Sequence, residues 1–413
     1  ADADFTLVTG IETLTANAAI DLDMTLGNFA AASGIKTVTL TGTATGDTDT
    51  VAIDADGPSV LTVNMDDDAN ELNSVIANAA YAGALTINAD GDELDTTVSV
   101  ITGGTGSDVL NITADAGGAA TMTSVTNIET INILGTTASQ AITLVDGNAA
   151  AATATVARQV LTVDASGLTT GVATINADAE SNAEIIIKGG AGDDIITISS
   201  STVVGDVITA GAGDDRIRIS QSADLTAADS INGGADGTGA TDVGDQLVFA
   251  ANSTVTDAQL TLVSNISTIT ADANILLNVT LGDVAASSGV NTVILTDTGG
   301  NDTVAINADA PSTITVEFDS DATNVNSVIA AATYAGAITV KAADTELDNT
   351  TSVFTGGTGS DTLEITAAGG AATTLGSVTN VETIKIVGTT LNSGATLFDA
   401  NATYSGSSSF QTI

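Results

Sequence analysis

Short runs in which apolar residues alternate with Thr, Asn or Asp recur along the whole chain. Examples are LTVNMD at 61–66, LTINAD at 85–90, LTVDAS at 161–166 and ATINAD at 173–178. A repeat of two residues is the pattern of a β-strand with one buried face. The runs return about every 10 to 25 residues, as expected for strands stacked coil on coil. The pattern predicts an all-β chain folded as a parallel β-solenoid or β-roll, with tandem β-sandwich domains as the alternative.

Few segments favour helix. The stretches 70–80 and 324–332 each predict a short helix that ends near Gly83 or Gly336, and 28–32 predicts a single turn stopped by Gly34 in a left-handed conformation. Thr is abundant along the chain, but its spacing does not predict one regular ladder of Thr side chains.

The chain contains an internal duplication. LVTGIET at 7–13 returns as LVSNIST 255 residues later, and SVTNIETI at 124–131 returns as SVTNVETI 253 residues later. The difference of two residues falls in the segment 42–49, which is expected to be a solvent-facing turn that tolerates deletion. We predict a first β-rich module over 1–137, connecting strands over 138–184, a central region over 185–249, a second module over 250–390 and an extension over 391–413.

Composition narrows the function classes. The formal net charge is -44, from 51 acidic and 7 basic residues. Such charge disfavours a compact state and calls for bound cations, and it excludes nucleic acid as a partner. The chain has no cysteine and no histidine, which excludes thiol catalysis, Ser-His-Asp triads and the usual zinc sites. No apolar run is long enough to predict a membrane span, and the low aromatic content of 2% favours a narrow interior of aliphatic side chains.

Four glycine-rich loops carry the candidate chemistry. They read GGTGSD at 103–108, GGAGDD at 189–194, AGAGDD at 210–215 and GGTGSD at 356–361. Glycines permit a tight turn that aims carbonyl oxygens at an ion, and the Asp adds the hard, charged ligand that calcium prefers. An apolar residue that begins a buried strand follows each loop, at Leu110, Ile196, Ile217 and Leu363. These loops resemble the calcium-binding nonapeptide of RTX proteins.

Calcium (Ca2+) is therefore the predicted metal. Asp206, Asp229 and Asp245 are assigned to degenerate or interrupted copies of the loop, whereas Asp90, Asp92, Asp236 and Asp297 fit ordinary turns better. The predicted ligand and loop residues are Gly104, Gly106, Asp108, Gly190, Gly192, Asp193, Asp194, Asp206, Gly211, Gly213, Asp214, Asp215, Asp229, Asp245, Gly357, Gly359 and Asp361. The central loops are expected to share ions between consecutive turns.

A second phrase accompanies these loops. It reads VTGIETL at 8–14, VTNIETI at 125–131 and VTNVETI at 378–384. Together with the loops and the Thr-, Ala- and Gly-rich composition, it makes the chain similar to bacterial surface-layer proteins of the RTX type. The resemblance implies type I secretion, calcium-triggered folding outside the cell, and calcium-dependent lattice assembly at the cell surface. An anchoring domain and a secretion signal are not recognisable, so the chain is expected to be a fragment or one processed repeat unit.

The leading functional prediction is a calcium-stabilised building block of a bacterial cell-surface layer or extracellular filament. Its expected partners are further copies of itself and a cell-surface polysaccharide. The alternative is an extender region of an RTX adhesin. An enzyme is not expected, because Arg158, Arg216 and Arg218 are the only arginines available to a lyase-type mechanism. Ice binding through rows of Thr is a further alternative.

Overall fold

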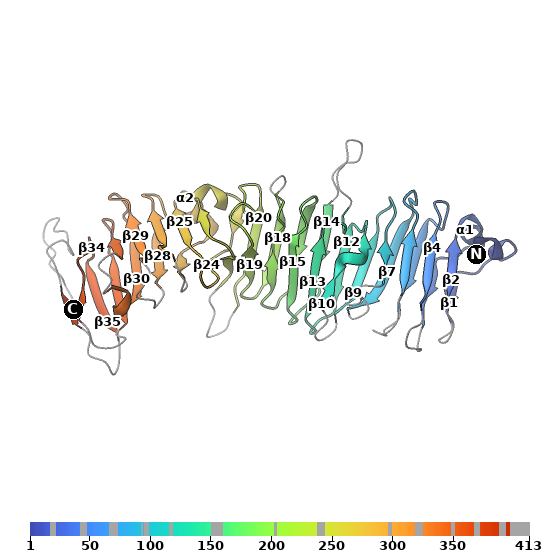
Figure 1. Cartoon of the computed structure of the whole chain (residues 1–413), viewed down its shortest axis with the longest axis horizontal. Helices are drawn as coiled ribbons and strands as arrows, with labels where there is room; N and C mark the ends of the chain where they lie inside the picture. Colours follow the sequence, from blue (N-terminus) through green and yellow to red (C-terminus); the bar gives the residue numbers. More distant parts are fainter. Residues whose placement is uncertain are drawn as a thin grey trace. The chain divides into compact units, whose positions relative to one another are not determined.

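The computed structural model describes residues 1–16, 22–41, 48–65, 73–91, 94, 99–114, 119–149, 160–201, 205–237, 244–295, 300–318, 325–347, 352–366, 372–387 and 394–396. The chain divides into two compact units, Ala1–Asp215 and Arg216–Ile413. Each unit is a parallel β-solenoid, and the described residues contain three short α-helices (Figure 1). The predicted fold class is confirmed. The β-sandwich alternative is wrong, because the strand pairs are parallel and each strand pairs with strands of the neighbouring coils.

In unit 1 the chain runs alternately through different sheets, one coil after another. The principal sheet has the order β1 (Thr13–Thr15), β3 (Thr37–Thr39), β5 (Val60–Asn64), β7 (Ala84–Asp90), β9 (Val109–Thr113), β12 (Thr130–Leu134), β14 (Val160–Asp164), β16 (Glu184–Lys188), β18 (Val207–Ala212). A second sheet contains β2 (Asp23–Leu26), β4 (Thr50–Ile53), β6 (Ser74–Ala77), β8 (Ile101–Thr102) and β11 (Val125–Thr126). A third contains β10 (Ala119–Thr121), β13 (Gln140–Val145), β15 (Ala173–Ala179) and β17 (Ile195–Thr197). Helix α1 (Asn28–Ser33) and the 3-10 turns η1 (Asp2–Phe5) and η2 (Met122–Ser124) complete the unit.

Unit 2 is built in the same way. Its principal sheet contains β19 (Arg216–Ile219), β21 (Gln246–Phe249), β24 (Thr268–Ala271), β26 (Thr292–Ile294), β28 (Thr313–Glu317), β30 (Ala337–Ala343), β32 (Thr362–Thr366) and β35 (Thr383–Val387). The second sheet contains β22 (Ser253–Val255), β25 (Leu277–Leu281), β27 (Thr303–Ile306), β29 (Ser327–Ala330), β31 (Val353–Thr355) and β34 (Val378–Thr379). The remaining elements are the pair β20 (Ser230–Ala235) and β23 (Val263–Ser264), the pair β33 (Ala372–Thr374) and β36 (Gly394–Thr396), η3 (Asp257–Leu260), α2 (Asp283–Ser288) and α3 (Asp344–Leu347).

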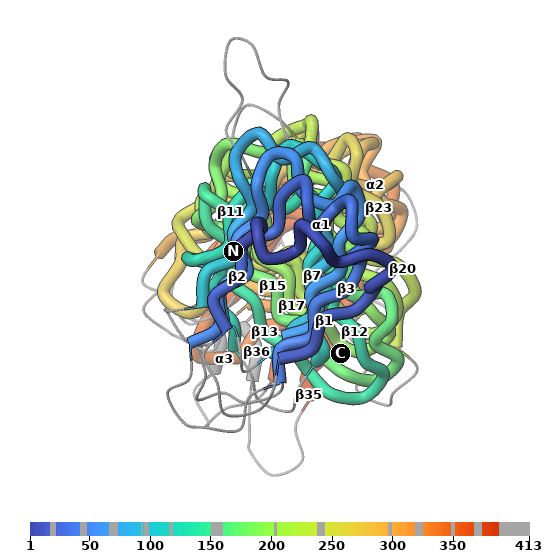
Figure 2. Tube along the Cα trace, turned by 90° about the vertical axis from the view of Figure 1, so that its right-hand side faces the viewer, coloured from blue at the N-terminus to red at the C-terminus, as the bar shows by residue number. Residues whose placement is uncertain are grey.

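Stacked columns of aliphatic side chains form the interior. In Figure 2 the blue and cyan coils of unit 1 lie one behind another around a common centre. The register places one inward residue of each coil above its counterpart in the next coil. One such column, buried throughout, consists of Val38, Val63, Ile87, Leu110, Ile131, Val163, Ile187 and Ile208. The two-residue period seen in the sequence thus directs one set of side chains inward and the other outward.

The outward positions form polar ladders. In unit 1 the side-chain amide nitrogen of Asn88 donates to the side-chain oxygen Oδ1 of Asn64 at 2.7 Å, and Asn111 and Asn132 continue the series. The Thr column beside it contains Thr13, Thr37, Thr62 and Thr86, then Val109, Thr130 and Thr162. In unit 2 the Thr column is Thr268, Thr292, Thr315, Thr339, Thr362 and Thr383. No single Thr ladder runs through both units, as expected, because Val109 interrupts the first column and the second lies in another sheet. Unit 2 nevertheless contains an unbroken run of six Thr residues, which loops of unequal length hide in the sequence.

Two helix predictions are also wrong. Strand β6 lies within 70–80 and strand β29 lies within 324–332. Their SVIA sequence alternates, with Val75 and Ala77 buried and Ile76 exposed, and pairs in parallel with the neighbouring coils. These segments are too short for the local sequence to distinguish a helix from a strand, so pairing with the neighbouring coils decides for the strand. The predicted turn at 28–32 is confirmed as α1, which ends at Gly34 with a φ of 97°.

The duplication extends to fine structure. Asp2 in η1 accepts the N–H groups of Gly27 and Ala30 at 2.8 and 2.9 Å, and so satisfies the start of α1. Asp257 in η3 does the same for Gly282 and Ala285 at 2.7 and 2.9 Å, at the start of α2. Partial burial opposes ionisation of Asp2, but the N–H groups of Ala30, Gly27 and Phe29 hold the pKa of this carboxyl below its ordinary value.

The boundary between the units lies within the predicted central region 185–249. The predicted module limits stay predictions, and the predicted extension 391–413 lies outside the described residues except for 394–396. Among the described residues, no helix combines the length and apolarity needed to cross a membrane.

Candidate metal-binding loops

Each glycine–aspartate loop lies at a corner where one strand ends and the next begins. The loop 103–108 joins β8 to β9, the loop 189–194 joins β16 to β17, and the loop 356–361 joins β31 to β32. The apolar residues predicted to follow the loops, Leu110, Ile196, Ile217 and Leu363, are fully buried as expected. The loops are therefore structural corners of the solenoid, and each of their Asp residues has an identifiable environment.

The Asp at the sixth loop position points inward and binds backbone amides. Asp108 accepts the N–H of Gly104 in its own loop at 2.7 Å and the N–H of Leu85 in the preceding coil at 3.1 Å, one on each oxygen. Asp361 repeats this arrangement with Gly357 at 2.7 Å and Ile338 at 2.9 Å. Both carboxylates are fully buried, and that burial raises their pKa. Each carboxylate thus ties its loop to the coil before it.

The backbone of the same Asp binds the coil that follows. The N–H of Asp108 donates to Oε2 of Glu129 at 2.8 Å, and the N–H of Asp361 donates to Oε2 of Glu382 at 2.7 Å. Glu129 and Glu382 are the acidic residues of the two VTNIETI-type phrases. Sequence reasoning recognised the phrase but assigned it no role. The phrase recurs about 21 residues after each GGTGSD loop, which is the length of one coil here. This spacing was the sequence signal that could have linked the phrase to the loop.

The Asn of that phrase has a geometric role. Asn127 and Asn380 adopt left-handed backbone conformations, with φ of 56° and 54°. Asn tolerates this conformation better than other residues with a Cβ, and Gly10 occupies the equivalent position in VTGIET. The carbonyl of Asn127 packs against Gly103 so closely that a Cβ at Gly103 would overlap it, and Asn380 stands in the same relation to Gly356. Loop and phrase are therefore two halves of one coil-to-coil contact.

The second and fourth loop positions are glycine because the coils approach closely there. A Cβ at Gly104 would overlap the carbonyl of Tyr81, and a Cβ at Gly106 would overlap the carbonyl of Gly83. The remaining predicted loop glycines face the carbonyl of a residue in the preceding coil in the same way: Gly190, Gly192, Gly211, Gly213, Gly357 and Gly359. The glycine pattern attributed to ion binding is explained by this packing.

The two central loops stack directly on one another. Asp194 accepts the N–H of Ala173 at 2.6 Å and that of Gly190, and its own N–H donates to Oδ1 of Asp215 at 2.7 Å. The preceding Asp residues also stack, since Oδ1 of Asp193 accepts the N–H of Asp214 at 2.9 Å. These four residues, predicted to share an ion, are brought together by hydrogen bonds between carboxylates and backbone amides.

The outlying Asp residues lie in separate turns. Asp206 accepts the N–H and the hydroxyl of Ser199 at 2.8 and 2.9 Å. Asp229 accepts the N–H of Thr226 at 2.5 Å. The backbone carbonyl of Asp245 accepts two N–H groups of the following coil, and its side chain is fully buried. All three Asp residues are buried.

The described side chains do not form a cage of several carboxylates around one point. Calcium takes about six to eight oxygen ligands and usually several carboxylates. The described residues contain no group of three or more acidic, His or Cys side chains placed to hold a metal. Both oxygens of Asp108, Asp194 and Asp361 receive N–H donors. Calcium binding at these loops stays a prediction, and the geometry assigns the carboxylates to the stacking of coils.

A tyrosine connects each of two loops, 103–108 and 356–361, to a further coil. The hydroxyl of Tyr81 donates to the carbonyl of Pro58 at 2.5 Å, and the carbonyl of Tyr81 accepts the N–H of Thr105 at 2.6 Å. Tyr334 repeats the contacts with Pro311 and Thr358 at the same distances. Burial, with a smaller contribution from the nearby carboxylate of Asp108 or Asp361, raises the pKa of each phenol to about 12. Sequence reasoning missed both tyrosines.

Removal of this hydroxyl is expected to weaken the fold without changing its shape. Tyr81→Phe leaves the carbonyl of Pro58 without its donor, which should lower the free energy of unfolding by about 1–2 kcal/mol. Tyr334→Phe should cost the same amount, because the two environments match. Urea unfolding followed by circular dichroism measures both. Unchanged midpoints in both variants would show that these hydroxyls contribute nothing to stability.

Acidification is expected to stabilise the chain through Asp194. Burial raises the pKa of this carboxyl from 3.8 to about 6; N–H groups of Ala173 and Gly190 oppose the rise, and the charge of Asp193 adds to it. Since the folded pKa exceeds the unfolded one, the folded state binds more protons between these values. Stability should therefore increase by about 1–3 kcal/mol as pH falls from 7 toward 4. Melting temperatures across this range test it, and Asp194→Asn should have a smaller slope than the parent chain.

No family model, curated protein or solved structure matches the chain.

Proposed function

We propose that the chain is a structural building block of a cell-surface layer or extracellular filament. The best support for this proposal is that the residues of its two recurring motifs connect neighbouring coils. The Asp, Glu, Asn and Gly residues of the two recurring motifs bind one coil to the next. A chain whose recurring motif residues serve its own stacking is suited to bear load and to present repeated faces.

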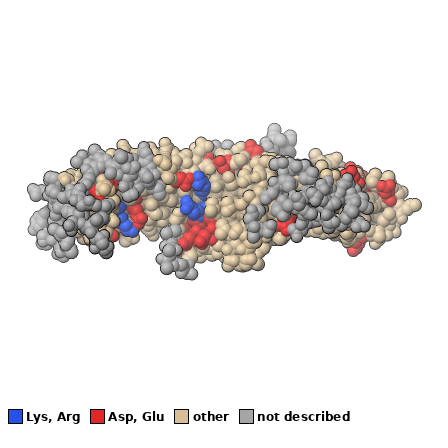
Figure 3. Space-filling view, turned by 60° about the horizontal axis from the view of Figure 1, so that its bottom comes forward, with Lys and Arg blue, Asp and Glu red and all other residues tan. Residues whose placement is uncertain are grey.

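Surface charge supports a role for calcium outside the loops. Most described basic side chains pair with acidic neighbours: Lys36–Glu12, Lys188–Asp164, Arg218–Asp272, Lys341–Glu317 and Lys385–Glu364. Figure 3 shows basic residues beside acidic ones on the face in view. Because these pairs use up most of the positive charge, the excess of acidic residues remains to oppose association. Divalent cations at the surface would reduce that repulsion.

The test is assembly with and without calcium. Light scattering and negative-stain electron microscopy are expected to show ordered polymers in millimolar calcium and dispersed protein in chelator. Sodium chloride of equal ionic strength is the control that separates general screening from a calcium effect. Dispersed particles in calcium at high protein concentration would contradict the proposal and favour the adhesin-extender alternative.

Ice binding is a second candidate because of the Thr columns. Hydroxyl and methyl groups repeat at the strand spacing of about 4.7–4.9 Å along the unit 2 column, whereas Val109 interrupts the unit 1 column. In unit 1 the adjoining Thr and Asn column is uncharged from Thr15 to Asn132, despite the acidity of the chain. A repeating, uncharged face would suit adsorption to a crystalline water surface. Failure to inhibit ice recrystallisation at micromolar protein would exclude this candidate.

A further inference from the structure

One corner of unit 1 buries oxygen atoms that lack a partner. Residues 180–183 form the turn between β15 and β16, and Ser201 lies in the next coil, after β17. Oε2 of Glu180, Oδ1 of Asn182 and Oγ of Ser201 are buried and have no hydrogen-bond partner among the described residues. We call these three residues, with Asp146 in the preceding coil, the Glu180 corner. Buried polar atoms without a partner are rare in folded proteins and require an explanation, such as bound water or a bound ion.

Hydrogen bonds between coils hold the corner together. Oε1 of Glu180 accepts the N–H of Asn182 at 2.9 Å, so the carboxylate folds back over its own turn. The carbonyl oxygen of Glu180 accepts the N–H of Ser200 at 3.1 Å, which places Ser201 beside the same turn. The side-chain nitrogen of Asn182 donates to the carbonyl oxygen of Asp146 at 3.2 Å. Three successive coils therefore meet here, those of β13, β15 and β17.

The corner carries negative charge that no basic side chain offsets. Glu180 is 0% exposed, and it takes part in none of the ion pairs that the described residues form. Burial raises the pKa of its carboxyl; the N–H groups of Asn182 and Ala183 oppose the rise, and the charge of Asp146 adds to it. A buried charge is costly unless an opposite charge lies close to it. A bound cation would supply that charge, whereas a water molecule would supply only hydrogen bonds.

The corners of the adjacent coils are satisfied without a cation. In the preceding coil, both ends of the side-chain amide of Asn148 are hydrogen-bonded to backbone groups. In the following coil, Asp206 accepts the N–H and the hydroxyl of Ser199, one on each carboxylate oxygen. Glu180 differs from both, because one oxygen of its buried carboxylate has no donor among the described residues.

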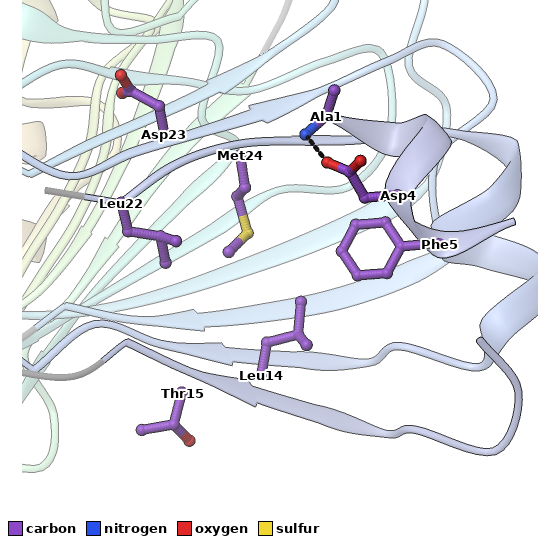
Figure 4. Close-up of a pocket in the computed structure, with 8 residues that line it drawn as sticks. All are labelled: Ala1, Asp4, Phe5, Leu14, Thr15, Leu22, Asp23 and Met24. Atoms are coloured by element: carbon purple, nitrogen blue, oxygen red, sulfur yellow. Dashed lines mark hydrogen bonds and ion pairs between the residues drawn. The ribbon is translucent and has the colours of Figure 1, made fainter. Parts of the chain in front are cut away.

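A hollow elsewhere in unit 1 shows that space alone does not indicate such a site. It has a volume of about 300 Å³ and lies between η1 and strands β1 and β2 (Figure 4). Two carboxylates line it, those of Asp4 and Asp23, and both are exposed, so water solvates them. The other lining residues include the apolar side chains of Phe5, Leu14, Leu22 and Met24. Buried charge, rather than volume, therefore distinguishes the Glu180 corner.

We propose that the Glu180 corner binds one calcium ion, with Oε2 of Glu180, Oδ1 of Asn182 and Oγ of Ser201 as its protein ligands. All three are hard oxygen atoms, and calcium takes about six to eight such ligands, water included. The charge of Asp146 adds to the attraction for a cation. This site lies outside the glycine–aspartate loops, and it does not depend on the proposed structural function.

Removal of the charge at Glu180 is the first test. Glu180→Gln keeps an oxygen for the N–H of Asn182, so the turn should stay folded, as circular dichroism can verify. Calorimetric titration of calcium into the chelator-treated chain should show one tight site in the parent and its loss in the variant. The rise in melting temperature on adding calcium should shrink in the same variant. In chelator, Glu180→Gln should melt at or above the parent, because it buries no charge.

The matched control is Glu184→Gln. It removes an equal charge four residues later, at an outward position of β16. Weak binding of calcium to the acidic surface should appear in both variants, whereas the tight site should be lost only in Glu180→Gln.

A pair of serine substitutions tests the ligand in the next coil. Ser201→Ala removes a proposed ligand and is expected to weaken calcium binding by about tenfold or more. Ser200→Ala is the control, because the hydroxyl of Ser200 donates to the carbonyl oxygen of Glu180 at 3.4 Å and is not a proposed ligand. Its calcium affinity should match that of the parent.

The outcomes separate this site from the proposed function. Titration curves that coincide for the parent and Glu180→Gln would overturn the site and mean that water or a bound proton satisfies the corner. If ordered polymers still formed in calcium, the structural function would stand without the site. Loss of the tight site in Glu180→Gln, in a chain that never forms polymers, would support the site and contradict the proposed function.

Discussion

Replacement of Gly106 by alanine is expected to destabilise unit 1 by about 3 kcal/mol or more. The new Cβ would overlap the carbonyl oxygen of Gly83 in the preceding coil. A backbone carbonyl cannot rotate away as a side chain can, so relief requires the two coils to separate. Separation would in turn strain the hydrogen bonds that Asp108 makes to both coils. Gly359→Ala should have the same effect in unit 2, where the Gly336 carbonyl takes the place of Gly83.

Gly147→Ala is the control for this prediction. Its nearest neighbour would be a methyl group of Thr126 at 3.6 Å, an ordinary contact. The free energy of unfolding should change by less than about 1 kcal/mol, and a small gain is expected from the stiffer unfolded chain. Urea unfolding of the three variants provides the comparison. If Gly106→Ala and Gly147→Ala unfolded at the same denaturant concentration, the close-packing explanation of the loop glycines would be wrong.

Asp108→Ala and Asp361→Ala are each expected to lower the free energy of unfolding by about 2–5 kcal/mol. The loss should be the same in calcium and in chelator. Each substitution leaves two buried N–H groups without an acceptor, those of Gly104 and Leu85 in the first case. Because the lost contacts are internal, added metal cannot restore them. Asp56→Ala, at an exposed turn position, is the control and should change stability by less than about 0.5 kcal/mol.

The alternative outcome is equally informative. A calcium ligand contributes to stability only when the metal is bound, so its removal would matter in calcium and hardly at all in chelator. Thermal unfolding of parent and variants in both conditions distinguishes the two roles. A loss confined to calcium would restore the RTX assignment of Asp108 and Asp361 and contradict the structural role given to them here.

Local pattern was enough to predict the architecture. Alternating runs such as LTINAD predict strands with one buried face, and Leu85 and Ile87 are indeed buried. Direct comparison of the sequence with itself revealed the duplication, which the paired capping residues Asp2 and Asp257 reproduce in detail. Gly34 was recognisable as a left-handed helix stop. These features depend on residues that are close in the chain, so the sequence displays them.

The partners of the motif residues were decided by the tertiary structure. Asp108 contacts Leu85 in the coil before it and Glu129 in the coil after it, each more than 20 residues away. Which residues meet across that distance depends on the register of stacked coils, and the register depends on the combined length of strands and irregular loops. The same dependence concealed the Thr columns and turned SVIA at 74–77 from an expected helix into a strand. The loop sequence alone is compatible with an ion bound between carboxylates. In the folded chain, backbone amides occupy those positions instead, because the stacked parallel coils bring N–H donors to each corner of the solenoid.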